Sequence, residues 1–391
     1  MIFNNLKNIS PDEIFSLNSE FISDTRKNKI NGGIGIYLDE NGNNYIHPSI
    51  RLAQKFLKQD NFNYLPIRGE INFLEEASKL LLGDDNFKSL KHLISSQSVN
   101  GGTNGLYIWG LLAKRAKKQP EIIVSNPTWE NHIKIFEDLG FKIKSYKHLT
   151  KTQKFNIEDF KKIIKKNKKA TILFHGGSTH NPTGVNPSVD EWKNIIGLLK
   201  DNGADVLFDF AYMGLGNDIN QDCYPIRLFI KNKIPVSVIL SFSKNMTLYQ
   251  HRTGIAFVYS KNKKTAESVQ SNLENIFRIV NSNPAAYGPM IAKTVLESKE
   301  LKTMWLKDLK KMSDSIKKRR KLFAKSSKGN FDYVRGQFGL FSLLTINKKN
   351  VEKLKKENGI YLLSNGRINF GGISNNNISI ASKAINNLFI D

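Results

Sequence analysis

Lys244 is the residue of this sequence with the clearest chemical potential. It follows an apolar and largely β-branched run, 236–240, which is typical of a strand covered on both faces. An ammonium group at the mouth of such a strand would be partly desolvated, and its pKa would fall. The free amine could then act as a nucleophile or a base. The simpler alternative is a solvated lysine just past a strand end.

Three further apolar segments are also followed by polar side chains. The segments are 121–127, 170–177 and 205–212, with helical patterns between them. The polar residues in or after them are Trp129, His132, Asn181, Asp209 and Tyr212. Alternating strands and helices predict an α/β fold with a mostly parallel sheet. Because ligands bind at the carboxyl ends of strands in such sheets, we expect these side chains to meet Lys244 at one edge.

Two helices carry clear boundary signals. Ser188, with Glu191 three residues later, predicts a capping box, and Gly203 predicts the end of the same helix. Apolar residues spaced along 301–323 predict one long amphipathic helix. That helix could join the sheet domain to a C-terminal unit. No linker rich in proline, glycine and serine is present, so a second domain should pack tightly on the first.

Length and composition indicate a globular protein of ordinary type. The chain has 391 residues, with 40% hydrophobic and 24% charged residues, which fits two domains or one domain with a smaller addition. No apolar run approaches the roughly 20 residues that cross a bilayer, and the first residues do not resemble a signal peptide. Cys223 is the single cysteine, so an internal disulfide or a cysteine-based metal site is excluded. We expect a cytoplasmic protein without a membrane or metal partner.

The formal charge of +24 raises the alternative of a nucleic-acid-binding protein. Lysine, however, is spread over nearly every expected helix and is not gathered in one patch. The aromatic residues do not alternate with basic residues, as a stacking platform for bases would require. We therefore expect no nucleic-acid partner.

The polar groups match what bound pyridoxal 5′-phosphate would need. Lys244 could form a Schiff base with this cofactor. Asp209 could keep the ring nitrogen protonated, with His132 orienting the carboxylate. Tyr212 and Asn181 could donate hydrogen bonds to the ring oxygen.

The same cofactor needs a phosphate site and a flat neighbour for its ring. Hydroxyls, a cation and the amides of a helix N-terminus would bind the phosphate. The residues available for this are Ser241, Ser243, Arg252, Gly102 and Thr103. Trp129 could stack on the ring.

The stretch SFSKNMTLYQHRTG, which contains Lys244, resembles the lysine segment of the aspartate/aromatic aminotransferases. These are class I, fold-type I enzymes of the Iα subgroup. Further matching segments follow the order of that family between residues 30 and 374. They are INGGIGIYLDENG, NYLPIRGEINF, SVNGGTNGL, SNPTWENH, HGGSTHNPTGVNP, DFAYMGLG, FRIVNSNPAAYG, QFGLFSLL and SNGRINFGGIS.

The resemblance implies a fold-type I architecture in two domains. A large cofactor-binding domain with a mostly parallel seven-stranded sheet, flanked by helices, would span 45–310. The C-terminal segment 311–391 would form a smaller α+β domain together with part of the N-terminal segment 1–44. The N-terminal segment would also form an arm.

The resemblance also implies two arginines that bind substrate. Arg367 would hold the substrate α-carboxylate beside Asn181 and the backbone of Gly35. Arg278 would reach across a dimer interface to the second carboxylate of a dicarboxylic substrate. A guanidinium suits both tasks, because it pairs bidentately with a carboxylate and stays charged. Tyr64 would donate to the cofactor phosphate of the neighbouring subunit, which makes the functional unit a homodimer with shared sites.

The implied reaction is transfer of an amino group by a ping-pong mechanism, with Lys244 as the base that moves the proton. Asn63, Thr103 and Asn283 resemble the residues of the aspartate-preferring branch of the family. Ile36 and Leu38 are instead more similar to those of the aromatic branch. We expect an enzyme that converts L-aspartate and 2-oxoglutarate into oxaloacetate and L-glutamate. A tyrosine/phenylalanine or broad-range aminotransferase is the first alternative. A decarboxylase or lyase that uses the same cofactor is the second, because one fold supports several reactions.

Overall fold

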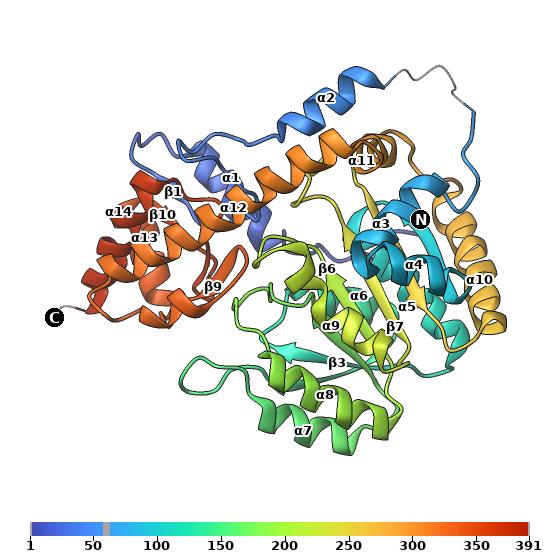
Figure 1. The fold of residues 1–391 in the computed structure, drawn as a ribbon. Coiled ribbons are helices and arrows are strands. Elements are labelled where there is room, and N and C mark those ends of the chain that lie inside the picture. The colour runs from blue at the N-terminus through green and yellow to red at the C-terminus, as the bar shows by residue number, and fades with distance from the viewer. Residues whose placement is uncertain (1, 58–62, 390–391) are drawn as a thin grey trace.

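The computed structural model describes residues 2–57 and 63–389, and a seven-stranded sheet lies at its centre (Figure 1). The strand order is β2-β8-β7-β6-β5-β3-β4. β8 is antiparallel to both of its neighbours, and the remaining pairs are parallel, which confirms the expected mostly parallel sheet. The bounds are β2 (Ile94–Val99), β3 (Glu121–Asn126), β4 (Lys142–Lys147), β5 (Thr171–His175), β6 (Val206–Phe210), β7 (Val236–Ser241) and β8 (Gly254–Tyr259).

The central strands are buried along their length. Every residue of β5 and β6 is buried, as their continuous apolar sequences predict for strands covered on both faces. β5 and β6 each end two residues before the segments 170–177 and 205–212 that the sequence suggests, and β7 ends at Ser241. The chain leaves the ladder and turns there, so Tyr212 and Lys244 lie in loops directly beyond β6 and β7.

Helices cover both faces of the sheet (Figure 1). The Ser188 hydroxyl accepts a hydrogen bond from the Glu191 amide at 3.2 Å, and the Glu191 carboxylate accepts one from the Ser188 amide at 2.7 Å, which confirms the capping box. Gly203 ends this helix with a left-handed φ of 63°. The helices of this part are α2 (Pro48–Phe56), α3 (Ile71–Leu82), α4 (Asp84–Leu90), η1 (Lys91–Leu93), α5 (Gly101–Ala116), α6 (Glu130–Asp138), α7 (Ile157–Lys166), α8 (Val189–Asn202), α9 (Ile219–Lys231), α10 (Lys263–Asn281) and α11 (Tyr287–Glu297).

A smaller α+β part combines the two ends of the chain. Its strands form two short pairs, of which β1–β10 is parallel and β9–β11 is antiparallel. The β1–β10 pair joins an early segment of the chain to a late one. The elements are α1 (Glu13–Ser23), β1 (Ile30–Asn31), η2 (Asp332–Gly336), β9 (Phe341–Leu343), α13 (Lys348–Asn358), β10 (Ile360–Tyr361), β11 (Arg367–Asn369), α14 (Asn375–Asn386) and η3 (Asn387–Phe389).

One long helix, α12 (Lys299–Ser326), connects the two parts, as the apolar spacing predicts (Figure 1). The helix crosses residue 310 without a break, so the domain boundary that we propose at 310/311 falls inside it. The other proposed boundary, at 44/45, falls just before α2.

Buried side chains of α12 hold segments on both sides of the connection. The Trp305 indole is fully buried and donates to the carbonyl of Asn245, next to Lys244, at 2.7 Å. Arg319 donates to the Gly371 carbonyl at 2.8 Å, and Arg320 donates to the Phe341 carbonyl at 2.6 Å. The helix therefore ties the lysine loop to the segments around β9 and β11.

Among the described residues, we find no helix with the length and apolar character that a membrane span requires.

We predict that Trp305→Phe lowers the free energy of unfolding by about 1–3 kcal/mol, because it removes the donor to a buried carbonyl and leaves unfilled volume. Urea denaturation followed by circular dichroism measures this change. The neighbouring Leu306, which is 39% exposed, supplies the control variant Leu306→Ala. An effect of Trp305→Phe no larger than that of the control would contradict the assigned role.

Candidate active site

A cavity lies at the carboxyl ends of β5, β6 and β7, where the sequence predicts a site. Ten of its twelve lining residues are ones that sequence reasoning selects, and His175 and Ala211 are additions. The lining residues are Gly102, Thr103, Trp129, His175, Asn181, Asp209, Ala211, Tyr212, Ser241, Ser243, Lys244 and Arg252.

The Lys244 ammonium group faces this cavity and lies 5.1 Å from the centre of the Tyr212 ring. Burial lowers the pKa of Lys244 from its ordinary 10.5 to about 8. The Asp209 carboxylate opposes this shift, while the positive charges of Arg252 and Arg367 add to it. A substantial fraction of the amine is thus unprotonated at mildly alkaline pH, as a nucleophile or base requires.

Asp209, on β6, is 9% exposed and is held by a chain of buried and half-buried groups. Its Oδ2 lies 3.0 Å from Nε2 of His132, on α6. The other ring nitrogen of His132 is 2.9 Å from the Thr128 hydroxyl, which is also 2.9 Å from Nε2 of His175. The carboxylate therefore has a fixed position, as the sequence-based role for His132 anticipates. His132, His175 and Asp209 offer atoms within 4.8 Å of one another, and these hydrogen bonds account for their clustering.

Tyr212 and Asn181 lie next to each other on the cavity wall, and their side chains interact. Burial raises the pKa of the Tyr212 hydroxyl, so this group stays protonated and can donate a hydrogen bond. Trp129 stands at the start of α6, with its ring edge-on to His132 at a centroid distance of 5.2 Å. The wall thus offers a flat side chain and a phenolic donor near Lys244.

One end of the cavity is built to receive an anion. α5 begins at Gly101 without a side-chain cap, which leaves the amides of its first turn available. Arg252 lies beside this helix start and donates to the Ser243 hydroxyl at 3.3 Å. A side chain at position 101 would collide with Arg252, since a Cβ there would be 2.4 Å from Nη2, and the backbone has a φ of +79°. The positive φ favours glycine at this position, and a larger residue would also displace the Arg252 guanidinium.

The hydroxyls of Ser241 and Ser243 complete the anion-binding end. Ser241 donates to Ser243 at 3.1 Å, and both side chains are buried. The residues that the sequence assigns to a phosphate are therefore together in space.

Arg367, on β11, lies beside the cavity and is 3% exposed. It donates to the Asn181 side chain at 3.2 Å and to the Gly33 carbonyl at 2.8 Å, and it stacks on Phe341 at 4.4 Å. Gly35 adjoins this group, because a Cβ there would be 3.3 Å from the Phe341 ring. Within the described part of the chain, no carboxylate forms an ion pair with Arg367, and its buried Nε has no hydrogen-bond partner. The guanidinium can therefore still bind a carboxylate ligand, to which it would donate hydrogen bonds.

Arg278 and Tyr64, in contrast, do not line the cavity of their own chain. Arg278 is exposed near the end of α10 and donates to the Ser282 hydroxyl at 2.8 Å. Tyr64 is 89% exposed. The structure of one chain therefore does not bring these two residues to the other predicted site residues.

Sequence reasoning did not assign roles to His175, Thr128 and Phe341. His175 is the last residue of β5. A histidine at the carboxyl end of a buried strand is the sequence signal that could have marked it as a site residue. Thr128 follows β3 among residues already noted, but its bridging position depends on the packing of α6 against the sheet. Phe341 contributes through its stacking on Arg367, which comes from a strand pairing between distant segments.

The arrangement joins a lysine with a lowered pKa, a fixed carboxylate, an anion site at a helix start and a buried guanidinium without a carboxylate partner. Together with the sheet order, these features define an α/β enzyme whose lysine can hold an anionic aromatic cofactor and whose arginine can hold a carboxylate substrate.

Comparison with known proteins agrees with this class. The model of the family "Aminotransferase class I and II" matches residues 27–385. Aspartate aminotransferase of Haemophilus influenzae is 34% identical over 98% of this chain and 99% of its own length. The structure of aspartate aminotransferase from Saccharomyces cerevisiae cytoplasm superimposes with a TM-score of 0.95 at 30% identity, covering 99% of this chain and 98% of that one. Aromatic-amino-acid aminotransferase of Burkholderia pseudomallei, solved covalently bound to pyridoxal phosphate, gives a TM-score of 0.94 at 30% identity, with 99% of both chains covered.

The chain belongs to the class I and II aminotransferase family. It is accordingly an aminotransferase with pyridoxal phosphate as its cofactor, and its substrates are small molecules of the amino acid and 2-oxo acid classes. The family assignment favours the expected amino-group transfer over the alternative of a decarboxylase or lyase.

We predict that Lys244→Met stabilises the cofactor-free protein at pH 7 by roughly 1–3 kcal/mol, because it removes a buried charge. The folded state releases the Lys244 proton near pH 8, whereas the unfolded state keeps it up to about 10.5. The gain should therefore be full below pH 8 and disappear as the pH rises to 10.5.

Urea denaturation of both proteins at several pH values measures this dependence. Lys318→Met, at an exposed position of α12, is the matched control and should show no such trend. A gain that is absent, or constant between pH 7 and 10.5, would show that Lys244 is not desolvated.

Proposed function

We propose that this enzyme transfers the amino group of L-aspartate to 2-oxoglutarate, giving oxaloacetate and L-glutamate. The observation that carries the proposed amino-group transfer from an amino acid is the buried Arg367 guanidinium, which has only neutral hydrogen-bond partners in the described chain and lies beside the Lys244 cavity. The aspartate aminotransferases among its full-length relatives support the choice of donor.

The residues present fit pyridoxal phosphate. Lys244 would bind it covalently, Asp209 would keep its ring nitrogen protonated, and His132 would orient Asp209. Tyr212 and Asn181 would donate to its ring oxygen, and Trp129 would cover its ring. The phosphate would be held by the amides and side chains of the anion-binding end: Gly102, Thr103, Ser241, Ser243 and Arg252.

When bound, this cofactor supplies an electron-accepting ring that stabilises negative charge at the substrate α-carbon. Arg367 would hold the α-carboxylate with Asn181 and the Gly35 backbone, which orients the α-hydrogen. The amine of Lys244 would remove that proton as a general base and later return it. Since its pKa is lowered to about 8, Lys244 can do both near neutral pH. The amino donor and the 2-oxo acid would bind in turn at the same groups, as a ping-pong cycle requires.

We further propose that two copies of the chain share their sites. Arg278 and Tyr64 are exposed, and Ile279 and Val280, next to Arg278, are 70% and 41% exposed. Contact with a second copy would cover these apolar side chains. It would also let Arg278 pair with the second carboxylate of a substrate, and Tyr64 donate to the phosphate, in the other copy's site.

An aromatic or broad-range donor preference is the competing candidate. Ile36 and Leu38 favour it, as does the likeness to structures of aromatic-amino-acid aminotransferases. The guanidinium of Arg68, a basic residue near Tyr64, donates to the carbonyl and hydroxyl of Ser96 at 2.9 Å, and Arg68 does not line the cavity of its own chain. Arg278 is thus the residue on which aspartate preference depends.

For the location of the enzyme we propose the cytoplasm. The single cysteine is buried, and a cytoplasmic aspartate aminotransferase is among the relatives.

We predict that Lys244→Ala abolishes turnover and the absorbance of lysine-bound cofactor near the visible edge, because no other lysine is among the described residues that line the cavity. Absorbance spectra and a coupled assay of oxaloacetate measure both properties. Exposed Lys318→Ala is the control and should retain both. Steady-state turnover that survives in the Lys244→Ala variant would refute the mechanism.

We predict that Arg278→Ala lowers kcat/KM for aspartate roughly 10- to 150-fold, the value of one charge-assisted pair, while kcat/KM for phenylalanine changes little. Steady-state kinetics with aspartate, tyrosine and phenylalanine as donors test this split. Arg115→Ala, at an exposed arginine of α5, is the control. Equal losses for aspartate and phenylalanine would favour the aromatic or broad-range alternative.

A further inference from the structure

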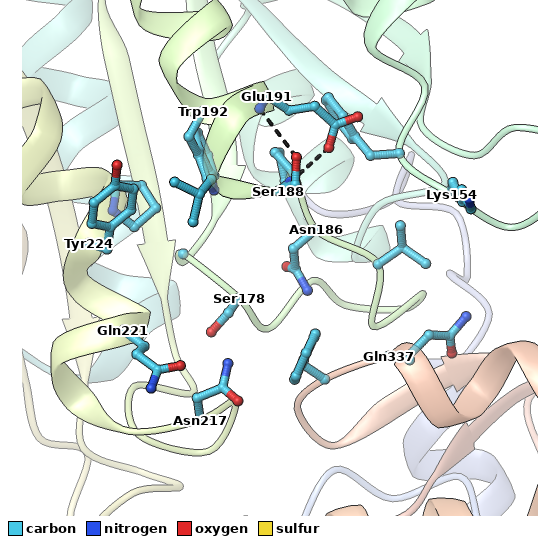
Figure 2. Close-up of a pocket in the computed structure, with 18 of the residues that line it drawn as sticks. Lys154, Ser178, Asn186, Ser188, Glu191, Trp192, Asn217, Gln221, Tyr224 and Gln337 are labelled. Carbon is cyan, nitrogen blue, oxygen red and sulfur yellow. Dashed lines mark hydrogen bonds between the residues drawn. The ribbon is translucent and has the colours of Figure 1, made fainter.

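A second and larger cavity, of ≈ 1050 Å³, lies next to the active site and shares none of its lining residues (Figure 2). Its walls come from five segments: the turn at 152–155, residues 177–178, the segment 185–192 at the start of α8, the segment 217–225 that enters α9, and the segment 333–338. It is therefore an open cavity that is lined by both the sheet part and the smaller part of the molecule. Its volume is at the upper end of the range for small-molecule sites.

Aromatic and proline rings form much of this wall. The rings are those of Phe155, Pro187, Trp192, Tyr224, Pro225, Tyr333 and Phe338. Trp192 is 3% exposed and is held edge-on to Phe174, at 5.0 Å between ring centres, so it is a rigid and largely covered part of the wall. In Figure 2, Trp192 and Tyr224 stand on the same side of the cavity. Flat, fixed walls of this kind favour a flat ligand.

Primary amides and hydroxyls face the same space. Figure 2 shows Ser178, Asn186, Asn217, Gln221 and Gln337 around it. Several are held by hydrogen bonds of their own. Asn186 accepts from the His180 amide at 3.0 Å, and the Gln221 side chain donates to Asp218 at 3.0 Å. Side chains fixed in this way lose little freedom when a ligand binds.

The cavity is nearly free of charge. Although the chain contains 59 lysine and arginine residues, Lys154 is the single basic residue in the described lining, and it is exposed. Glu191, the single acidic residue there, is engaged with the Ser188 amide in the capping box. Phosphates and dicarboxylates would therefore find few partners, and an uncharged ligand would be favoured.

We propose that this cavity binds an uncharged, planar nitrogen heterocycle of the nucleobase or nucleoside class. Such a molecule combines flat faces, which suit the aromatic wall, with donors and acceptors on its edges, which side-chain amides of asparagine and glutamine pair with well.

A ligand there would touch the back of the loop that carries Asn181. Residues 180–186 contribute Asn181 to the first cavity and Val185 and Asn186 to the second. This loop is held by hydrogen bonds from the Phe338 amide to the Gly184 carbonyl and from His148 to the Val185 carbonyl, both at 2.9 Å. This cavity is thus a second site next to Asn181, the side chain assigned to substrate binding. Binding of a ligand in it does not depend on which amino acid is the donor.

Gly336 offers a way to block the cavity without disturbing the fold. It lines the cavity, is exposed, and a Cβ there would meet no atom within 4 Å. Gly336→Trp should fill part of the space. Gly197, on α8, has equally open surroundings but is not part of the lining, so Gly197→Trp is the matched control.

The test is isothermal titration of the cofactor-loaded enzyme with adenosine, guanosine and uridine. We expect at least one to bind with a dissociation constant below about 1 mM, and Gly336→Trp to weaken that binding at least about tenfold. Gly197→Trp should bind as the parent enzyme does, and circular dichroism checks that both variants fold. Gln221→Ala, at an exposed residue of the wall, should also weaken binding. Absence of saturable binding, or binding unchanged in both Gly336→Trp and Gln221→Ala, would overturn the proposal.

Discussion

The hydrogen bond between Asp209 and His132 is the contact on which the rest of the site depends. Asp209 is the single carboxylate among the described residues that line the cavity, where it faces Lys244 and Arg252, with Arg367 beside them. Without this fixed negative charge, three cations would converge in a poorly solvated space. Even with Asp209, positive charge is in excess. That imbalance favours an anionic cofactor and a carboxylate substrate as occupants, because both would neutralise it.

The fold holds these charges together by two devices. Parallel strands β5, β6 and β7 end at one edge, which brings residues from distant parts of the sequence to one cavity. The long helix α12 then fixes the lysine loop through Trp305 and the β9 segment through Arg320, so that Arg367 comes to the same place as Lys244. Burial in this rigid frame lowers the pKa of Lys244 to about 8, which suits a group that must accept and return a proton.

Much of this arrangement could be predicted from the sequence, because strand–helix alternation and polar residues at strand ends are local signals. The capping box at Ser188, the long helix and most cavity residues followed from such signals. The bridging role of Thr128 and the stacking of Phe341 on Arg367 could not be predicted in this way, because they depend on how distant segments pack. The sequence pattern places the ends of β5 and β6 two residues too late for a related reason: periodicity does not show where a chain leaves the ladder to turn. The larger cavity between the two parts has no sequence signature at all, since its wall comes from five separate segments.

The central claim, that the amine of Lys244 and the groups around it converge on one cofactor, can be tested directly by chemical labelling. Borohydride treatment of the cofactor-loaded enzyme fixes the cofactor to the amine that holds it, and peptide mass spectrometry then identifies that residue. The predicted result is one modified peptide, carrying the label on Lys244. A label on any other lysine, or no label at all, would contradict the account.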